Sequence, residues 1–118
     1  MKQEWTIPIT LESYANKSEN RWQEGKRKKR HNAAIDLYFR VQPCEIKPPC
    51  KVTLVRIGSR SLDFDNLAYA FKRILDHIGA ILMPHKAIGH ADGSGELKID
   101  YMQKKGRPSA IQIIIEDL

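Results

Sequence analysis

The sequence predicts a small α+β domain in which helices pack on a mixed sheet, with the elements in the order β-α-β-α-β-β. Two stretches place apolar residues three and four positions apart, as on one face of a helix. Four others alternate apolar and polar residues or are rich in β-branched ones, as strands are. The chain has 118 residues, 42% of them hydrophobic, so it can form one core but not two ordinary domains. We therefore expect a single domain over residues 1–118.

The N-terminal half should hold a strand, a long helix and a second strand. The first strand is indicated by alternating apolar residues: Trp5, Ile7, Ile9 and Leu11. Pro8 lies within it and cannot donate a ladder hydrogen bond, which indicates a sheet edge or a bulge. A helix is expected over about residues 20 to 40, with an apolar stripe in its later part: Ala34, Leu37, Tyr38 and Val41. Residues 51–57 are rich in β-branched side chains and predict an inner strand.

The C-terminal half should begin with the best-patterned helix of the chain, which starts within residues 61–67 and should end at Gly79. Its predicted buried face contains Leu67, Ala70, Phe71, Ile74, Leu75 and Ile78. Two alternating stretches follow, over residues 97–103 and 111–115, and a turn at residues 104–108 joins them. We expect these two strands to pair as an antiparallel hairpin.

The chain is basic, with 20 lysine and arginine residues against 14 acidic ones, a net charge of +6 and an isoelectric point near 9.4. This balance favours a polyanionic partner such as nucleic acid, although a solvated basic face would have the same composition. Consecutive cations surround the first helix on every side: Lys26, Arg27, Lys28, Lys29 and Arg30. We expect them to bind phosphates without reading base sequence, unless they form a frayed, solvated helix start. Trp22 is expected to be buried, with stacking on an exposed base as the alternative.

Two features bear on the cellular compartment. No stretch approaches the roughly 18 apolar residues of a membrane span, and the N-terminus does not resemble a signal peptide. We therefore expect a cytosolic protein without a membrane partner. Five residues separate Cys44 from Cys50, a spacing that fits neither a redox pair nor a zinc half-site, so they are expected to be reduced thiols.

Two carboxylates, Asp63 and Asp65, stand at the head of the second predicted helix. One aspartate there would be explained as a helix cap that also complements the positive end of the helix dipole. A cap needs only one, and the pair together with Asn66 offers more oxygen atoms than a cap uses. Such ligands suit Mg²⁺ or Mn²⁺, which bind through a few carboxylates and a substrate phosphate. On local sequence alone, a metal site and a capping cluster are equal alternatives.

The motif around these acids is Leu62-Asp63-Phe64-Asp65-Asn66-Leu67, and an amphipathic helix, a loop with another aspartate and two strands follow it. In this order the elements resemble the RusA-type Holliday-junction resolvases and their phage relatives, most clearly from about residue 60 onward. The resemblance implies a small, homodimeric, Mg²⁺-dependent endonuclease acting on branched DNA in recombination and repair, with Mn²⁺ as a substitute metal. A homodimer also suits the two-fold symmetry of a four-way junction.

The resemblance assigns metal-binding roles to acidic residues. Asp63 and Asp65 match the two acids of the family's Asp-x-Asp-Asn-Leu motif, and the next two residues complete it. Asp92 is the candidate for the third acid, and Asp100 is the fallback.

The resemblance also points to cations that contact phosphate. The family often has a lysine four residues after the second motif acid, where this chain has Tyr69. Lys72, one helical turn from Tyr69, is the candidate for the same phosphate contact. Arg60 joins residues 26–30 as a candidate contact to the DNA backbone.

Two alternatives stay open. His85, His90 and Asp92 could hold zinc or manganese in a glycine-rich loop, although a loop with two histidines is more often incidental. The chain could also be a non-catalytic DNA-binding module, in which residues 26–30 bind DNA and the two acids only cap the second helix.

Overall fold

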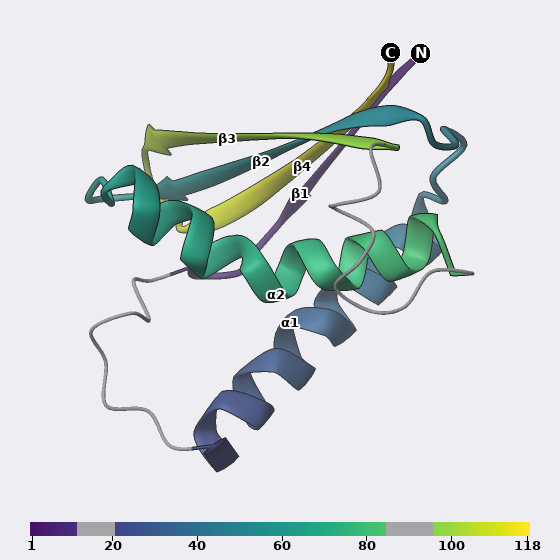
Figure 1. Ribbon diagram of the computed structural model, residues 1–118. Helices are drawn as coiled ribbons and strands as arrows, with labels where there is room; N and C mark the ends of the chain where they lie inside the picture. The colour runs from purple at the N-terminus through teal and green to yellow at the C-terminus, as the bar shows by residue number, and fades with distance from the viewer. Residues whose placement is uncertain (12–20, 85–95) are drawn as a thin grey trace.

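The computed structural model describes residues 1–11, 21–84 and 96–118. Its elements are β1 (Lys2–Ile7), α1 (Arg21–Val41), β2 (Cys50–Gly58), α2 (Phe64–Leu82), β3 (Leu97–Lys105) and β4 (Ala110–Asp117). Both helices cover the same face of a four-stranded mixed sheet, with α2 next to the sheet and α1 slanting away from it (Figure 1). The predicted α+β class and element order are confirmed.

The sheet has the strand order β1-β4-β2-β3. β4 pairs antiparallel with both β1 and β2, whereas β2 and β3 run parallel, from Cys50 opposite Leu97 to Gly58 opposite Lys105. The predicted β3–β4 hairpin is wrong, because β2 lies between these two strands. Burial explains the order: β4 is rich in fully buried isoleucine and takes a central place, whereas β3 exposes charged side chains and takes an edge.

The inner face of α2 packs on the core. The residues predicted for this face are all buried: Leu67, Ala70, Phe71, Ile74, Leu75 and Ile78. The helix does not end at Gly79 as predicted, because Ile81 and Leu82 continue to pack against the core. It ends where Met83 N–H donates to Gly79 O at 2.8 Å. Each large aliphatic side chain buried in this way contributes about 1.5–3 kcal/mol, so α2 is a firm support for the residues at its start.

β1 is shorter than the alternation of the sequence predicted. It ends at Ile7, and Pro8 follows, while Ile9 and Leu11 stay buried beyond the strand. The strand occupies an edge of the sheet, next to β4 alone, as Pro8 indicated. β2 lies between β4 and β3, so its prediction as an inner strand is confirmed.

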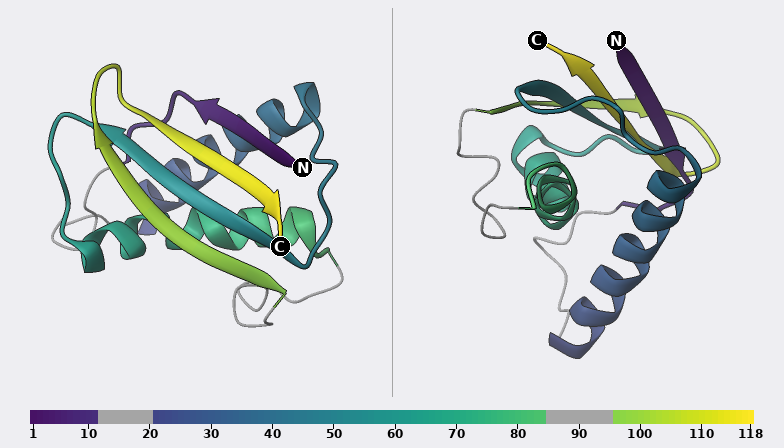
Figure 2. Two further views of the ribbon diagram at one scale, coloured as in Figure 1. Left: turned by 90° about the horizontal axis from the view of Figure 1, so that it is seen from above. Right: turned by 90° about the vertical axis from the view of Figure 1, so that its right-hand side faces the viewer.

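α1 is divided into a packed half and a projecting half. Ile35 and Phe39 are buried, and Phe39 stacks on Trp5 with ring centroids 4.4 Å apart. Leu37 and Val41 of the predicted apolar stripe are exposed, because the helix turns a different face to the core, the one that carries Ile35 and Phe39. The N-terminal turns of α1 lie farthest from the sheet (Figure 2). Neither described helix has the length and apolar character needed to cross a membrane.

Candidate functional site

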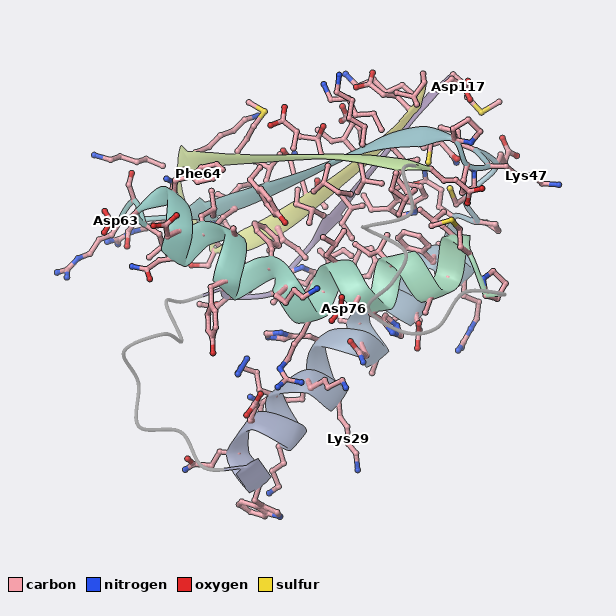
Figure 3. All side chains as sticks on the ribbon, viewed as in Figure 1. Lys29, Lys47, Asp63, Phe64, Asp76 and Asp117 are labelled. Carbon is pink, nitrogen blue, oxygen red and sulfur yellow. The ribbon has the colours of Figure 1, made fainter. Side chains whose placement is uncertain are left out.

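The acid pair lies at the N-terminus of α2, where Figure 3 labels Asp63. Asp63 is the N-cap residue, with an extended backbone (φ −61°, ψ 154°), and Asp65 belongs to the first turn. Both side chains are exposed. Within the described part of the chain the Asp63 carboxylate makes no capping hydrogen bond, and its backbone carbonyl accepts from Leu67 N–H at 2.8 Å. The two carboxylates therefore offer solvent-facing oxygen atoms of the kind that Mg²⁺ prefers.

A side chain from β3 holds the residue that precedes the pair. Gln103 Nε2 donates to Leu62 O at 2.7 Å, and Gln103 Oε1 accepts from Leu62 N–H at 2.9 Å. The Leu62 side chain is half-buried and packs against the core. The backbone N–H and C=O of Leu62 are both hydrogen-bonded, and its side chain is packed. The sheet therefore fixes the backbone just before Asp63.

A second support comes from β2. Arg56 is only 8% exposed; its Nε donates to Leu11 O at 2.7 Å, and its Nη1 donates to Arg60 O. Gly58 leaves room for this guanidinium, since a Cβ atom there would lie 3.0 Å from it. Arg56 therefore ties the segment after β1 to the segment that leads into Asp63.

The residue between the two acids anchors the first turn of α2. Phe64 is 68% exposed, but its ring meets Tyr101 of β3 edge-on, with centroids 6.2 Å apart. Tyr101 in turn stacks against the buried Phe71, at 6.1 Å. An aromatic chain therefore connects the exposed start of α2 to the core. Sequence analysis did not identify Arg56, Gln103 or this chain; the available signals were a charged residue within an apolar strand and a polar one on the inner face of β3.

Parallel pairing brings further cations to the same end of the sheet. Lys105 is opposite Gly58, and Gly106 N–H donates to Gly58 O at 3.0 Å, so the end of β3 lies beside the segment that leads to Asp63. The exposed cations at this end are Arg60, Lys104, Lys105 and Arg107. Sequence analysis selected only Arg60, because it treated the others as a hairpin turn. The strand-helix-strand order of β2, α2 and β3 was the signal for a parallel pair.

Of the two candidates for a third acid, the structure describes only Asp100, and it lies away from the pair. Asp92 lies outside the described residues, as do His85 and His90 of the alternative zinc site. Asp100 points to the face of the sheet away from the helices, because its neighbours in β3 pack against the core and its carboxylate lies 3.9 Å from Lys51 Nζ. Across residues 1–11, 21–84 and 96–118, no three His, Cys, Asp or Glu side chains gather as they would around a metal ion.

Lys72 lies on the exposed side of α2. Its Nζ is 3.1 Å from Asp76 Oδ1, one helical turn further on, so part of its charge is balanced by that carboxylate. Tyr69, which occupies the position of the expected lysine, is 60% exposed. Both side chains are accessible on the surface of the helix that carries the acids.

The cationic run occupies the projecting half of α1, and we call residues 22–30 the basic arm. Lys29 and Asp63 lie well apart in Figure 3, so the arm and the acid pair are separate surfaces. Four of the five cations are exposed: Lys26, Lys28, Lys29 and Arg30. Trp22, also in the arm, is 67% exposed, so its expected burial is wrong.

An ion pair and a hydrogen bond link the basic arm and the rest of α1 to α2. Glu24 pairs with Arg73, and His77 Nε2 lies 2.7 Å from Asp36 Oδ1. His31 is half-buried at the end of the run, where desolvation first, and then the charges of the neighbouring arginines, lower its pKa from 6.5 to about 4. Its imidazole therefore adds no charge to the arm at neutral pH.

Comparison of the chain with models of known protein families, with curated proteins and with solved structures gave no match. What the site does therefore has to be inferred from its own residues.

Proposed function

We propose that the chain is a metal-dependent endonuclease of the RusA type that cleaves four-way junctions or related branched DNA. The observation that carries this proposal is the pair of exposed carboxylates at the supported start of α2, where Asp63 does not cap the helix. An aspartate that caps a helix through its side chain accepts a hydrogen bond from a backbone N–H of the first turn. Here the carboxylate faces solvent, with that of Asp65 two residues away, and two such groups repel a phosphodiester unless a cation is bound between them.

Asp63 and Asp65 would hold Mg²⁺, or Mn²⁺ in its place, with Asp92 as the proposed third ligand. When bound, the ion supplies charge neutralisation at the phosphodiester and activation of water for hydrolysis. The cations that flank the pair bind the DNA backbone beside the scissile phosphate: Arg60, Lys104, Lys105 and Arg107. Lys72, on the same helix, is proposed to approach that phosphate from the side of α2.

The basic arm is proposed to bind a second part of the same substrate. Its cations are separated from the acid pair, so they would bind phosphates other than the one that is cut. Contacts of this kind neutralise phosphates and do not read bases, so affinity should fall steeply with salt. A homodimer would supply two acid pairs for the two strands that a four-way junction requires to be cut.

The test is a cleavage assay on a four-way junction, a flap, a duplex and a single strand, with Mg²⁺, Mn²⁺ or a chelator. Asp63→Asn and Asp65→Asn should each abolish metal-dependent cleavage while keeping the fold, because both side chains are exposed. Asp100→Asn is a matched control, since it removes the same charge from the other face of the sheet. If both motif variants cut junctions as well as the parent, the catalytic assignment is wrong.

The competing hypothesis is a non-catalytic DNA-binding module. The observation in its favour is that the described residues bring only two acids to the start of α2. The cations of the basic arm are exposed and could bind DNA without any contribution from these acids. A parent protein that binds junctions tightly in Mg²⁺ and never cuts them would establish this hypothesis in place of the nuclease.

A further inference from the structure

Trp22 is exposed and takes no part in the hydrophobic core. The other tryptophan, Trp5, is 2% exposed, stacks on Phe39 and donates from its indole Nε1 to Gln42 O at 2.9 Å. Trp22 instead leaves 67% of its surface in solvent, in the first turn of the helix half that projects from the sheet. A single exposed apolar side chain is common on protein surfaces, so the groups around Trp22 decide which ligand it fits.

A lysine one turn away occupies one face of the indole. Lys26 Nζ lies 3.8 Å from the ring centroid, a cation–π contact between residues four apart on α1. The contact covers part of the ring, and the 67% of Trp22 that stays exposed leaves indole surface for a second flat group. It also places an ammonium group within reach of any phosphate attached to that group.

The charges that follow Trp22 define the partner. Lys28, Lys29 and Arg30 are exposed along the same arm. From Trp22 to Arg30 the helix rises ~12 Å at about 1.5 Å per residue. A stacked strand spaces its phosphates about 3.4 Å apart along its axis, so this length spans at most about three to four of them. At about 3.6 residues per turn, Lys29 and Arg30 lie on the same side of α1 as Trp22 and Lys26. Lys28 lies on the other side, among residues of α2. An aromatic ring with cations on its own side of a helix matches a nucleotide chain whose terminal base is unstacked.

A lipid surface is the other ligand that tryptophan and lysine commonly contact, but the arm is unsuited to it. Interfacial helices bury a continuous apolar face, and from residue 21 to residue 32 Trp22 is the only large apolar side chain. A single indole among cations instead resembles the stacking platforms of single-strand-binding surfaces.

We propose that Trp22 and Lys26 form a stacking site for an unpaired DNA base, so that the basic arm prefers single-stranded segments at a branch point over continuous duplex. This inference rests on the proposed function in taking DNA as the substrate, but it concerns binding and not cleavage. The cations of the arm bind the phosphates of single strand and duplex alike by charge, whereas the preference for single strand comes from the indole.

The test uses the full-length protein in chelator, so that no strand is cut. Single-stranded oligothymidylate should quench tryptophan fluorescence of the parent, and Trp22→Leu should abolish the quenching while the buried Trp5 still reports a folded core. Affinity for the single strand should fall about 5- to 150-fold in Trp22→Leu, the loss expected for one stacked base. Trp22→Phe should recover most of it, and affinity for a duplex of equal length should change less than about twofold.

A double variant of the cations separates stacking from charge. Lys29→Ala with Arg30→Ala should reduce the salt dependence of single-strand binding by about 1.4, at about 0.7 per lost phosphate contact, and keep the quenching at saturation. Trp22→Leu should leave that salt dependence unchanged, because stacking releases no counterions.

Several results would overturn the stacking site. These are unchanged parent fluorescence on adding single strand, equal losses for single strand and duplex in Trp22→Leu, or a response to anionic phosphatidylglycerol vesicles without one to DNA. The outcome is independent of catalysis: if Asp63→Asn and Asp65→Asn still cut, the nuclease proposal fails while the stacking site is judged on these binding data alone.

Discussion

Replacement of Gln103 by methionine tests whether β3 sets the position of the acid pair. The variant keeps the length of the side chain but removes both hydrogen bonds to the Leu62 backbone, at 2.7 and 2.9 Å. Each bond contributes about 0.5–1.5 kcal/mol, and the Leu62 N–H and C=O lose their partners at a half-buried position. We expect the free energy of unfolding to fall by about 2 kcal/mol, measured by urea denaturation followed by circular dichroism.

Gln103→Met should also slow junction cleavage by about ten- to a hundredfold under single-turnover conditions, because a small displacement of a reacting group is costly. Gln112→Met is the matched control. That amide bonds the Thr6 hydroxyl at 3.3 Å between exposed side chains, so its loss should change stability by less than about 0.5 kcal/mol and leave cleavage intact. Equal behaviour of the two variants in both assays would refute the supporting role of Gln103.

Three further predictions follow from buried groups. Because the folded pKa of His31 is about 4, below its unfolded value of 6.5, the unfolded state binds more protons between these values and stability falls as the pH drops through this window. His31→Gln should flatten that loss, on the order of 1 kcal/mol after discounting for partial exposure, in denaturation curves at pH 7 and pH 4.5. Gly58→Ala should displace the Arg56 guanidinium from its carbonyl partners and cost about 1–3 kcal/mol in thermal denaturation, whereas Ser59→Ala, at an exposed neighbour, should cost almost nothing. Both cysteines are free, as predicted, and burial raises the pKa of Cys50, which is 0% exposed. A thiol reagent at pH 8 should therefore modify Cys50 only after denaturant is added. Rapid reaction of both thiols in the native protein would contradict the burial of Cys50.

Helical periodicity predicted the packing of α2 well, because six apolar residues on one face leave a single way to bury them. The buried face of α1 was harder to predict, because its sequence allows two adjacent apolar faces. The packing of Phe39 on Trp5 selects the face that carries Ile35. Alternation in the strands predicted which side chains face the core but not which strand lies next to which. That depends on the burial of β4 against both β1 and β2, which is a property of the assembled sheet.

Sequence reasoning identified the site residues that lie close together in the sequence. It missed those that strand pairing brings to them. Only one residue separates Asp63 from Asp65 in the sequence, so their exposed position at the start of a helix could be inferred from the motif. The contribution of Gln103 could not, because it requires β3 to lie parallel to β2, beside the segment before α2. The same pairing brings Lys105 opposite Gly58, beside the segment that leads to the acids, whereas a hairpin would have placed it elsewhere.

The central position of β4 also determines when the protein can fold. β4 is the last strand to be synthesised, yet it separates β1 from β2, so the sheet cannot close until residues 110–117 have left the ribosome. β1 pairs with β4 from Lys2 opposite Glu116 to Ile7 opposite Ile111, so many native contacts join residues far apart in the sequence, which raises the contact order. Folding should accordingly be slow for a chain of this size, and a nascent chain without β4 would expose the apolar edge of β2 to chaperones and proteases.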